Sequence, residues 1–212
     1  MASVGLMFVG AVLFVNGLLL LGKIDAKSAG VFNIFVGVLQ VAVPFYLIAT
    51  AETPDDILLS AGIFLFGFTY LYVGITNLAG YPPLGLGWYC FWVMILAAAF
   101  GLTNIIRFDD VNSGMLWLHW AVLWALFGFV LALGRDRLTP VTGWVTLVMS
   151  FTTCTIPGFL LLLGEWGNVS TALVFVVTAV EVAFFLAVAA STMRRGVSDA
   201  QESPASTPGA VA

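Results

Sequence analysis

The stretch GLLLLGKIDAKSAGVF, residues 17–32, decides the fold of this chain. An apolar run ends at Gly22, a short charged loop follows, and a second apolar run begins at Gly30. Glycine is favoured directly after a helix, where the backbone needs a positive φ, and at the start of a neighbouring membrane helix it allows close packing. The stretch therefore predicts two apolar helices joined by a tight loop.

The same pattern occurs twice more along the chain. An apolar run, a glycine, a short loop and a second glycine recur in two further stretches: ITNLAGYPPLGLGWY at 75–89, with Gly80 and Gly87, and VLALGRDRLTPVTGW at 130–144, with Gly134 and Gly143. Pro44 and Pro157 also fall at matching places, late in the second helix of their copies. Because each copy contains two helices, all copies have the same orientation, which makes the repeat parallel rather than inverted. Three hairpins around one axis predict a six-helix bundle with a path through its centre.

The composition places this repeat in a membrane. Of the 212 residues, 61% are hydrophobic and 8% are charged, whereas a soluble domain carries about 25% charged residues. A helix needs about 20 apolar residues to cross the hydrocarbon core. The chain is therefore predicted to be an all-α polytopic membrane protein with seven spans: 3–22, 29–50, 57–79, 86–105, 114–133, 141–163 and 168–191.

We expect three parts along the chain. Residues 1–163 form the six-helix channel bundle of three hairpin repeats, and residues 164–193 form an additional span outside the repeat. Residues 194–212 are rich in Ser, Pro and Ala, and we expect them to be a disordered cytoplasmic tail. The N-terminal segment lacks the basic region of a cleavable signal peptide, so we interpret it as the first span.

Basic residues predict the orientation of the spans. They lie in the loops after the first and fifth spans and directly after the seventh: Lys23, Lys27, Arg135, Arg137, Arg194 and Arg195. The loops on the other side are mainly acidic, with Arg107 as their basic residue. Since basic loops stay in the cytoplasm, the N-terminus is expected outside and the C-terminus inside.

Few residues of the chain could carry catalytic chemistry. A single histidine, with acidic residues mostly in loops, supplies neither a Ser-His-Asp set nor a metal cluster, so we expect no enzyme, no cofactor and no metal. Cys90 and Cys154 lie in apolar runs without CxxC spacing, which predicts small buried side chains. The lysines, Lys23 and Lys27, both lie in a loop, which excludes a retinal Schiff base in the seventh span.

Residues 115–127, MLWLHWAVLWALF, place Trp117, Trp120, Trp124 and the only histidine, His119, in one span. Tryptophans at the ends of a span form interfacial belts, and Trp117 suits that position, whereas Trp124 lies too deep for it. His119 is either a packed side chain or a lumenal, pH-sensing one, because histidine changes its charge near neutral pH.

Aligning the three copies predicts which helix faces line the central path. With the first glycines superimposed, two sets of positions match: Phe8, Phe66 and Trp120, and one turn further on Val12, Tyr70 and Trp124. Residues four apart lie on one helix face, so copies two and three both present rings there. Copy one stays open, because slipping it by one residue presents Val9 and Leu13 instead.

Four stretches of the chain resemble the AmiS/UreI family: GAVLFVNG at 10–17, KIDAKS at 23–28, FLFGFTYLYVGITN at 64–77 and WLHWAVLW at 117–124. This family comprises urea channels of urease-bearing bacteria and short-chain amide transporters encoded beside amidases. The resemblance covers residues 1–163. It implies a homo-oligomer, a hexamer, of three-hairpin protomers in the bacterial plasma (inner) membrane, with a functional link to a cytoplasmic amidase or urease.

The resemblance also implies a channel lining. The constrictions of the family's urea channel match nine positions of this chain: Val9, Leu13, Asn16, Phe66, Tyr70, Trp117, Trp120, Leu123 and Trp124. It therefore favours the slipped register of copy one. Met149 stands where the family has a lumenal glutamate, which favours an amide with an alkyl group over urea. The outer loops are short and contain no histidine, unlike the loops linked to acid gating in that channel.

We thus expect a passive channel for small neutral amides, with urea and acetamide as the model substrates. Flat solutes would pass between rings while Trp N–H groups, the Tyr hydroxyl and Asn16 replace lost water, and a slot without charges would exclude ions. The alternative is a proton-coupled amide or urea carrier that uses Glu181 or His119. An acid inside a membrane span is functional by default, although Glu181 could also pack against a neighbouring helix. A stripe of small residues on the seventh span predicts close packing at the rim of the protomer: Ala179, Ala183 and Ala187.

Overall fold

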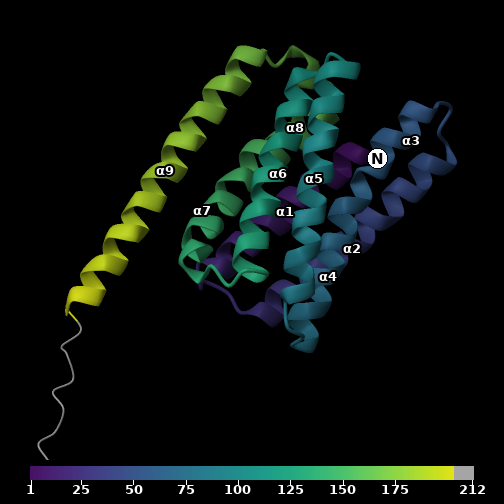
Figure 1. The fold of residues 1–212 in the computed structure, drawn as a ribbon. Coiled ribbons are helices and arrows are strands. Elements are labelled where there is room, and N and C mark those ends of the chain that lie inside the picture. Colours follow the sequence, from purple (N-terminus) through teal and green to yellow (C-terminus); the bar gives the residue numbers. More distant parts are fainter. Residues whose placement is uncertain (203–212) are drawn as a thin grey trace, which may run out of the picture.

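A computed structural model describes the backbone of residues 1–202 and the side chains of residues 1–192. All secondary-structure elements in this part of the chain are helices, joined by short loops (Figure 1). The α-helices are α1 (Ala2–Leu20), α2 (Ala26–Ala49), α3 (Pro54–Ala61), α4 (Ile63–Ala79), α5 (Leu84–Arg107), α6 (Val111–Leu131), α7 (Thr139–Met149), α8 (Ile156–Leu163) and α9 (Thr171–Glu202). The short elements are η1 (Asp136–Leu138), η2 (Ser150–Thr155) and η3 (Trp166–Asn168).

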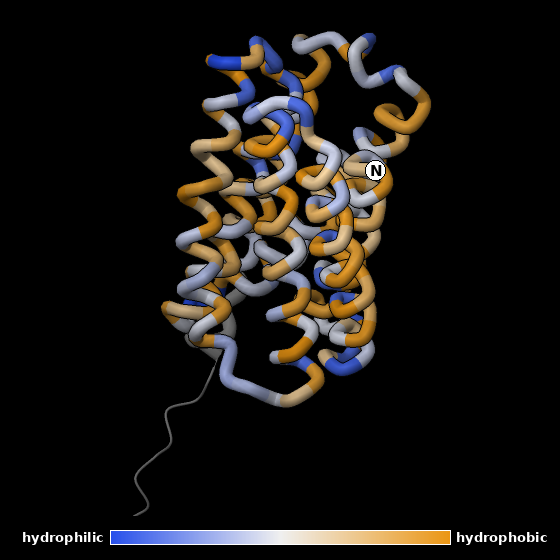
Figure 2. The backbone as a smooth tube through the Cα atoms, turned by 90° about the vertical axis from the view of Figure 1, so that its right-hand side faces the viewer, coloured by the Kyte–Doolittle hydropathy of each residue, from blue (hydrophilic) through white to orange (hydrophobic). Residues whose placement is uncertain are grey.

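Within the part of the chain that the structure describes, seven helical segments are long and apolar enough to cross a membrane, which confirms the predicted spans. The third span combines α3 and α4, and the sixth combines α7, η2 and α8. Hydrophilic segments gather mainly at the two ends of the molecule, with the apolar band between them (Figure 2). Such a band is what a bilayer of about 30 Å hydrocarbon thickness requires.

The loops between the helices have the predicted chemistry. Gly22, Gly80 and Gly134 end their helices with φ values of +69°, +72° and +59°, which L side chains rarely adopt. At the start of α2, the Asp25 carboxylate accepts hydrogen bonds from the side chain and the backbone N–H of Ser28. These bonds lower the pKa of Asp25.

The six spans of the repeat close into a ring. The second helix of each copy packs most extensively on the first helix of the next copy: α2 on α4, α5 on α6, and α7, η2 and α8 on α1. Contacts between the two helices of one hairpin are fewer. The sequence therefore repeats hairpin by hairpin, but the largest packing contacts join helices of two neighbouring hairpins.

The second glycine of each copy makes these close contacts, as the sequence predicted. A Cβ atom added to each would crowd the neighbouring copy: at Gly30 it would lie 3.0 Å from Leu78 Cγ, at Gly87 2.4 Å from the Ala132 nitrogen, and at Gly143 2.9 Å from Leu21 Cγ. The three contacts are equivalent around the ring. They show that the third copy packs on the first as the first packs on the second.

The same packing defines the register of copy one. Three further glycines oppose equivalent residues of the neighbouring copy: Gly17 opposes Leu147, Gly74 opposes Ile34 and Gly128 opposes Phe91. In copy one this glycine lies five residues before the helix-ending glycine, but in the other two copies it lies six residues before. Copy one is therefore slipped by one residue, so that Val9 matches Phe66. One turn further on, Leu13 matches Tyr70.

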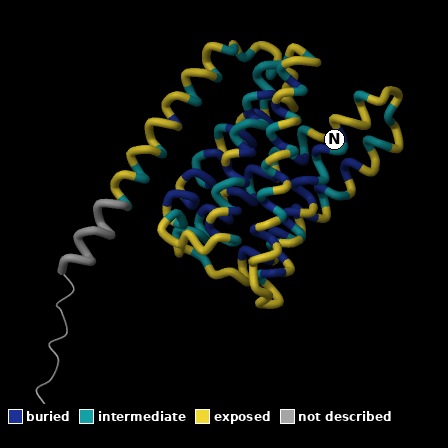
Figure 3. Tube along the Cα trace, viewed as in Figure 1, coloured by how far each residue is buried: buried dark blue, intermediate teal, exposed yellow. Residues whose placement is uncertain are grey.

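The seventh span, α9, lies outside the ring. Figure 3 shows buried residues concentrated in the six-span ring, whereas α9 is mostly exposed, and it contacts mainly α7 and α6. Ala179, Ala183 and Ala187 are among its exposed residues. The helix continues to Glu202, beyond the boundary near 193 that the composition suggested, and residues 203–212 of the predicted tail lie outside the described residues.

Candidate functional site

An elongated cavity of about 110 Å³, which we call the slot, lies between the first helices of the three copies. The helices α1, α4 and α6 form its walls together with part of α5, and every lining side chain is uncharged: Leu13, Asn16, Leu19, Leu20, Phe66, Thr69, Tyr70, Val73, Thr76, Asn77, Pro83, Leu86, Cys90, Trp120, Leu123, Trp124, Phe127 and Leu131. Space for one water needs about 10–15 Å³, so the slot has room for a molecule of a few heavy atoms.

The structure brings seven of the nine predicted lining residues to the slot: Leu13, Asn16, Phe66, Tyr70, Trp120, Leu123 and Trp124. Val9 and Trp117 do not line it. Val9 is completely buried in the core, and the ring of Trp117 stacks on Phe100 at a centroid distance of 4.8 Å. The family resemblance implies both positions, but in this fold their side chains pack against the protein interior instead.

Aromatic rings pack tightly at one level of the slot. The ring centroid of Phe66 lies 4.9 Å from that of Trp120, in an edge-to-face arrangement, and 4.8 Å from that of Trp124. Such pairs stabilise one another beyond the area that they bury. These rings form a rigid wall against which a flat solute can stack.

The two tryptophan N–H groups are not free to bind a solute, which corrects the expectation from sequence. Trp120 Nε1 donates to the Thr153 hydroxyl at 3.0 Å, and Trp124 Nε1 donates to the Thr69 hydroxyl at 3.3 Å. Each threonine in turn donates to a backbone carbonyl of the preceding turn, that of Met149 and that of Leu65 respectively. A hydrogen-bond chain thus fixes each indole ring and leaves only its apolar faces for the slot.

Asn16 also has a partner that the sequence did not reveal. Its side-chain amide pairs with that of Asn33 on α2, through two hydrogen bonds of 3.0 Å and 2.7 Å, and Asn33 additionally donates to the Ala29 carbonyl. Both amides are buried. Because an amide has two donors and two acceptor lone pairs, Asn16 keeps some hydrogen-bonding capacity beside the slot.

Helix periodicity explains the lining residues that the sequence reading missed. From Phe66, the slot side of α4 continues through Thr69, Tyr70, Val73 and Asn77, which lie three, four, seven and eleven residues further on. A face defined at two positions could therefore have been extended along the whole helix. The contributions of α5, Leu86 and Cys90, had no such signal.

The sixth span departs from α-helical geometry beside the slot. Residues Ser150–Thr155 form a π-helical segment, and a Cβ atom on Gly10 of α1 would lie 2.2 Å from the Thr155 hydroxyl. Segments of this kind occur frequently at functional sites. Here the segment carries Thr153, the acceptor for Trp120. Met149, directly before it, is buried and does not line the slot.

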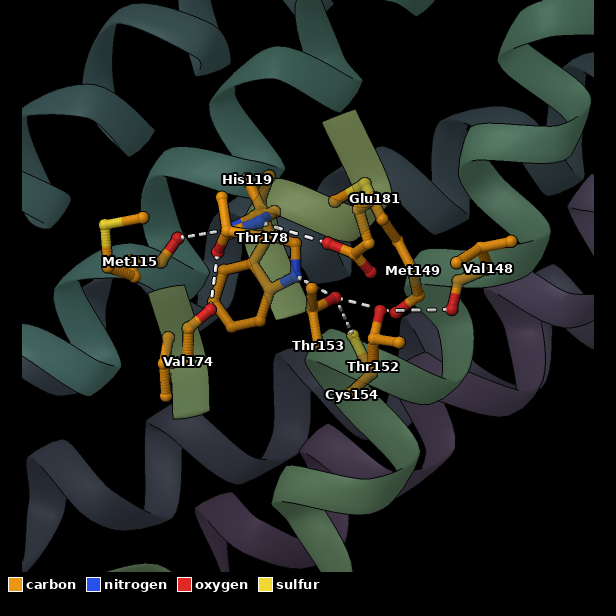
Figure 4. A network of polar contacts seen from close by, with 11 residues as sticks. Met115, His119, Val148, Met149, Thr152, Thr153, Cys154, Val174, Thr178 and Glu181 are labelled. Carbon is orange, nitrogen blue, oxygen red and sulfur yellow. Dashed lines mark hydrogen bonds and ion pairs between the residues drawn. The ribbon is translucent and has the colours of Figure 1, made fainter. Parts of the chain in front are cut away.

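His119 and Glu181 lie together outside the slot (Figure 4). The His119 Nε2 is 3.2 Å from a carboxylate oxygen of Glu181 on α9, and both side chains are largely buried. The other ring nitrogen, Nδ1, lies 2.7 Å from the Met115 carbonyl oxygen, so it must carry a proton and donate. The acid that had no partner by sequence therefore pairs with the only histidine.

This pair lines a second cavity of about 160 Å³, which we call the α9 cavity. Its walls come from α6, η2, α8, η3 and α9: Leu116, His119, Thr152, Thr153, Ile156, Pro157, Leu160, Trp166, Val169, Leu173, Val174, Val177, Thr178 and Glu181. Thr153 belongs to this cavity and accepts the hydrogen bond from Trp120 of the slot. A hydrogen bond between Thr153 and Trp120 thus connects the walls of the two cavities.

Comparison with known proteins agrees with this architecture. A family model described as "AmiS/UreI family transporter" matches residues 1–165. "Putative transporter protein AmiS2" of Rhodococcus erythropolis is 49% identical over 167 residues, which are 78% of this chain and 81% of that protein. A "Putative amidate substrates transporter protein" of Mycolicibacterium smegmatis is 41% identical, over 78% of each chain.

A solved structure is similar as well. The crystal structure of the urea channel from the human gastric pathogen Helicobacter pylori matches with a TM-score of 0.69 and 30% sequence identity. The match covers 78% of this chain and 99% of that one. The family model ends at residue 165, before α9 begins at Thr171.

Proposed function

The chain belongs to the AmiS/UreI family, a family of transporters and not of enzymes, and on this premise we propose that it is a passive channel for small neutral amides. The model substrates are urea and short-chain amides of the acetamide type. The observation that carries this proposal is the slot, whose lining contains rings, aliphatic side chains and neutral polar groups but no charge.

This lining suits a flat, neutral solute. The slot offers ring faces at one level and neutral hydrogen-bonding groups elsewhere, so an amide can exchange part of its hydration for contacts with the protein. An ion would lose its hydration without finding a charge or a ring of carbonyl groups to replace it. Ions are therefore expected not to pass.

The lining of the slot favours an amide with an alkyl group over urea. Most of this lining is aliphatic or aromatic, and Met149, which stands in place of a glutamate of the family, is buried outside it. A relative that shares 41% of its residues carries a name that refers to amidate substrates. A link to an amidase that consumes the imported amide follows from this preference.

A proton-coupled carrier that uses Glu181 or His119 is the second candidate. The observation that favours it is their contact at 3.2 Å, because a buried acid and base in contact can share and exchange a proton. The pair, however, lines the α9 cavity and not the slot. A carrier would have to transmit a change of protonation through Thr153 and Trp120.

The placement in the membrane and the assembly are part of the proposal. The loops that contain Lys23 and Arg135 lie at the same end of the molecule as the far end of α9 (Figure 1), which supports an outside N-terminus and a cytoplasmic C-terminus in a bacterial inner membrane. We infer a homo-hexamer, with the exposed face of α9 at the rim of the protomer or between protomers.

Uptake into proteoliposomes tests the function. Stopped-flow light scattering with urea and with acetamide, at acidic and at neutral pH, is expected to give rapid flux that increases linearly with the gradient and is faster for acetamide. Equilibration without accumulation distinguishes a channel from a carrier. Accumulation of acetamide driven by a pH gradient would support the proton-coupled candidate instead, and flux equal to that of empty liposomes would contradict both.

A further inference from the structure

The hydrogen-bonding groups of the slot divide into those with a partner and those without. The indole N–H groups, the Thr69 hydroxyl and Asn16 all bind other groups of the protein. The Tyr70 hydroxyl, the Thr76 hydroxyl and the Asn77 side-chain nitrogen have no such bond, and of these the Thr76 oxygen and the Asn77 nitrogen are buried without any hydrogen bond from residues 1–192. Burying such groups unpaired costs free energy, so they mark a place where something else can bind.

Thr76 is an exception among the buried threonines of residues 1–192. The other four, Thr69, Thr142, Thr146 and Thr153, all donate to the carbonyl oxygen four residues earlier. Thr76 is equally buried, at 5% exposure, and also lies within a helix, yet its hydroxyl makes no such bond. Its hydroxyl therefore has no hydrogen-bond partner among residues 1–192, and Thr76 lines the slot.

The position of these two residues is fixed by the end of α4. The carbonyl oxygen of Thr76 accepts the N–H groups of Gly80, at 2.9 Å, and Tyr81, at 3.2 Å, and Gly80 has the left-handed conformation that ends the helix. The Asn77 side chain lies against α2, where a Cβ atom on Gly30 would be 3.2 Å from Asn77 Cβ. The backbone that carries the pair is thus fixed before any solute arrives, which lowers the entropy cost of binding.

The two residues also lie apart from the aromatic level of the slot. Asn77 is seven residues beyond Tyr70 and eleven beyond Phe66, about 10 Å and 16 Å along a helix. Around them the slot is lined by the aliphatic residues Leu19, Leu20 and Leu131 and by Pro83. The slot consequently has a ring-lined level and a separate polar place in an aliphatic surrounding.

The donors present there suit a carboxamide. The Asn77 nitrogen provides two N–H donors, and the Thr76 hydroxyl is one donor and also an acceptor. A carbonyl oxygen has two lone pairs and can accept from both residues at once, while the adjacent amide N–H can donate to the Thr76 oxygen. No charged side chain lines the slot, so a neutral group is favoured over a carboxylate.

We propose that Thr76 and Asn77 form the subsite of the slot that binds the carboxamide of the solute, with its carbonyl oxygen as the acceptor. This inference rests on the proposed function and assigns to two residues of α4 the recognition that the tryptophan N–H groups cannot provide. The ring faces then select for flatness, and the Thr76–Asn77 subsite selects for an oxygen acceptor. Selectivity among amides therefore depends on two separate levels of the slot.

Thioacetamide tests the subsite, because it has nearly the shape of acetamide but its sulfur is a weak hydrogen-bond acceptor. Stopped-flow permeability of the full-length protein in liposomes is expected to be higher for acetamide than for thioacetamide. Thr76→Val and Asn77→Leu keep the side-chain shape but remove the donors, and each is expected to lower the acetamide-to-thioacetamide ratio about three- to tenfold. Thr76→Ser, which keeps the hydroxyl, is expected to retain the ratio.

A matched control comes from another buried threonine. Thr142 is completely buried on α7, away from the slot, so Thr142→Val should leave the ratio unchanged. An unchanged ratio in both Thr76→Val and Asn77→Leu, in protein that conducts acetamide, would overturn the subsite but not the channel. Absence of any amide flux in the wild type would overturn the proposed function and the subsite together.

Discussion

The slot and the α9 cavity meet at α6, where the neighbouring residues Trp120 and His119 each line one of them. The slot has no charged side chain, and its walls are equivalent faces of a threefold repeat. The α9 cavity contains a buried acid and base, and the helix that supplies the acid lies beyond the segment matched by the family model. The comparison teaches that the uncharged slot is built by the repeat alone, whereas the buried contact between an acid and a base needs the helix α9 outside the repeat.

Removing an aromatic ring from the slot is the most direct test of whether the slot is the path of the solute, and it should have the largest effect. Trp124→Ala deletes a stacking face, and an aromatic contact of this kind contributes about 0.5–1.5 kcal/mol. We expect the ratio of acetamide to water permeability to fall by up to about tenfold, measured by stopped-flow with assembled protein. The matched control is Trp88→Ala, because Trp88 is 56% exposed on α5. An unchanged ratio in Trp124→Ala would show that the slot is not the path.

A substitution of Thr153, which lines the α9 cavity and accepts a hydrogen bond from Trp120 of the slot, is expected to change acetamide permeability less. Thr153→Val removes the acceptor of the Trp120 N–H but keeps the shape of the side chain, so the indole loses one fixed hydrogen bond. Since such a bond contributes about 0.5–1.5 kcal/mol, acetamide permeability should change about threefold. Thr153→Ser restores the acceptor and should restore the rate. Equal acetamide permeability in the two variants and the wild type would show that the hydrogen bond between Thr153 and Trp120 has no influence on transport through the slot.

Neutralising the acid of the α9 cavity should affect transport least of the buried changes. Glu181→Gln replaces the carboxylate by a neutral amide that can still face His119 Nε2. For a passive channel we expect acetamide flux within about twofold of wild type, at acidic and neutral pH alike. If the variant abolished accumulation driven by a pH gradient in the wild type, the proton chemistry would belong to transport and the contrast between the cavities would fail.

Asp25, the exposed carboxylate at the start of α2, is expected to have the smallest effect of the charged groups, and unlike the buried Glu181 it should affect stability only. The hydrogen bonds from Ser28 lower the pKa of Asp25 below its ordinary value of 3.8. Its contribution to stability is therefore fully present above that value and is lost as the pH falls through the lowered pKa. Asp25→Asn keeps a cap without this titration, so its unfolding temperature in detergent should fall less on strong acidification than that of the wild type. Amide flux at neutral pH should be the same in both.

The relation between sequence and site is clearest on the first helices of the three copies. The repeat and the family resemblance led to Phe66, Tyr70, Trp120 and Trp124, because ring-bearing residues four apart must share a helix face. The hydrogen-bonding state of these rings could not be predicted in the same way. Trp120 is 33 residues from its acceptor Thr153, and the contact depends on how a π-helical segment of the sixth span packs on α6.

Glu181 illustrates the same limit for charges. Its place within an apolar span indicated an unusual residue, but the sequence offered no partner charge in another span. The partner is a histidine 62 residues earlier, and the two side chains meet only because α9 packs beside α6. A contact across that separation follows from helix packing and has no local pattern.

The sequence by itself determined the seven spans, the parallel repeat and the glycine-ended helices of this protein, because the length of an apolar run, its period and a positive φ are local properties. The tertiary structure alone decided the closure of the ring, the one-residue slip of copy one and the division of the polar groups into paired and unpaired. All three features depend on which helices pack together and on the register in which they pack. The free energy of that arrangement comes from packing between residues far apart in the chain. For this reason the absence of hydrogen-bond partners at Thr76 and Asn77 could be learned only from the folded molecule.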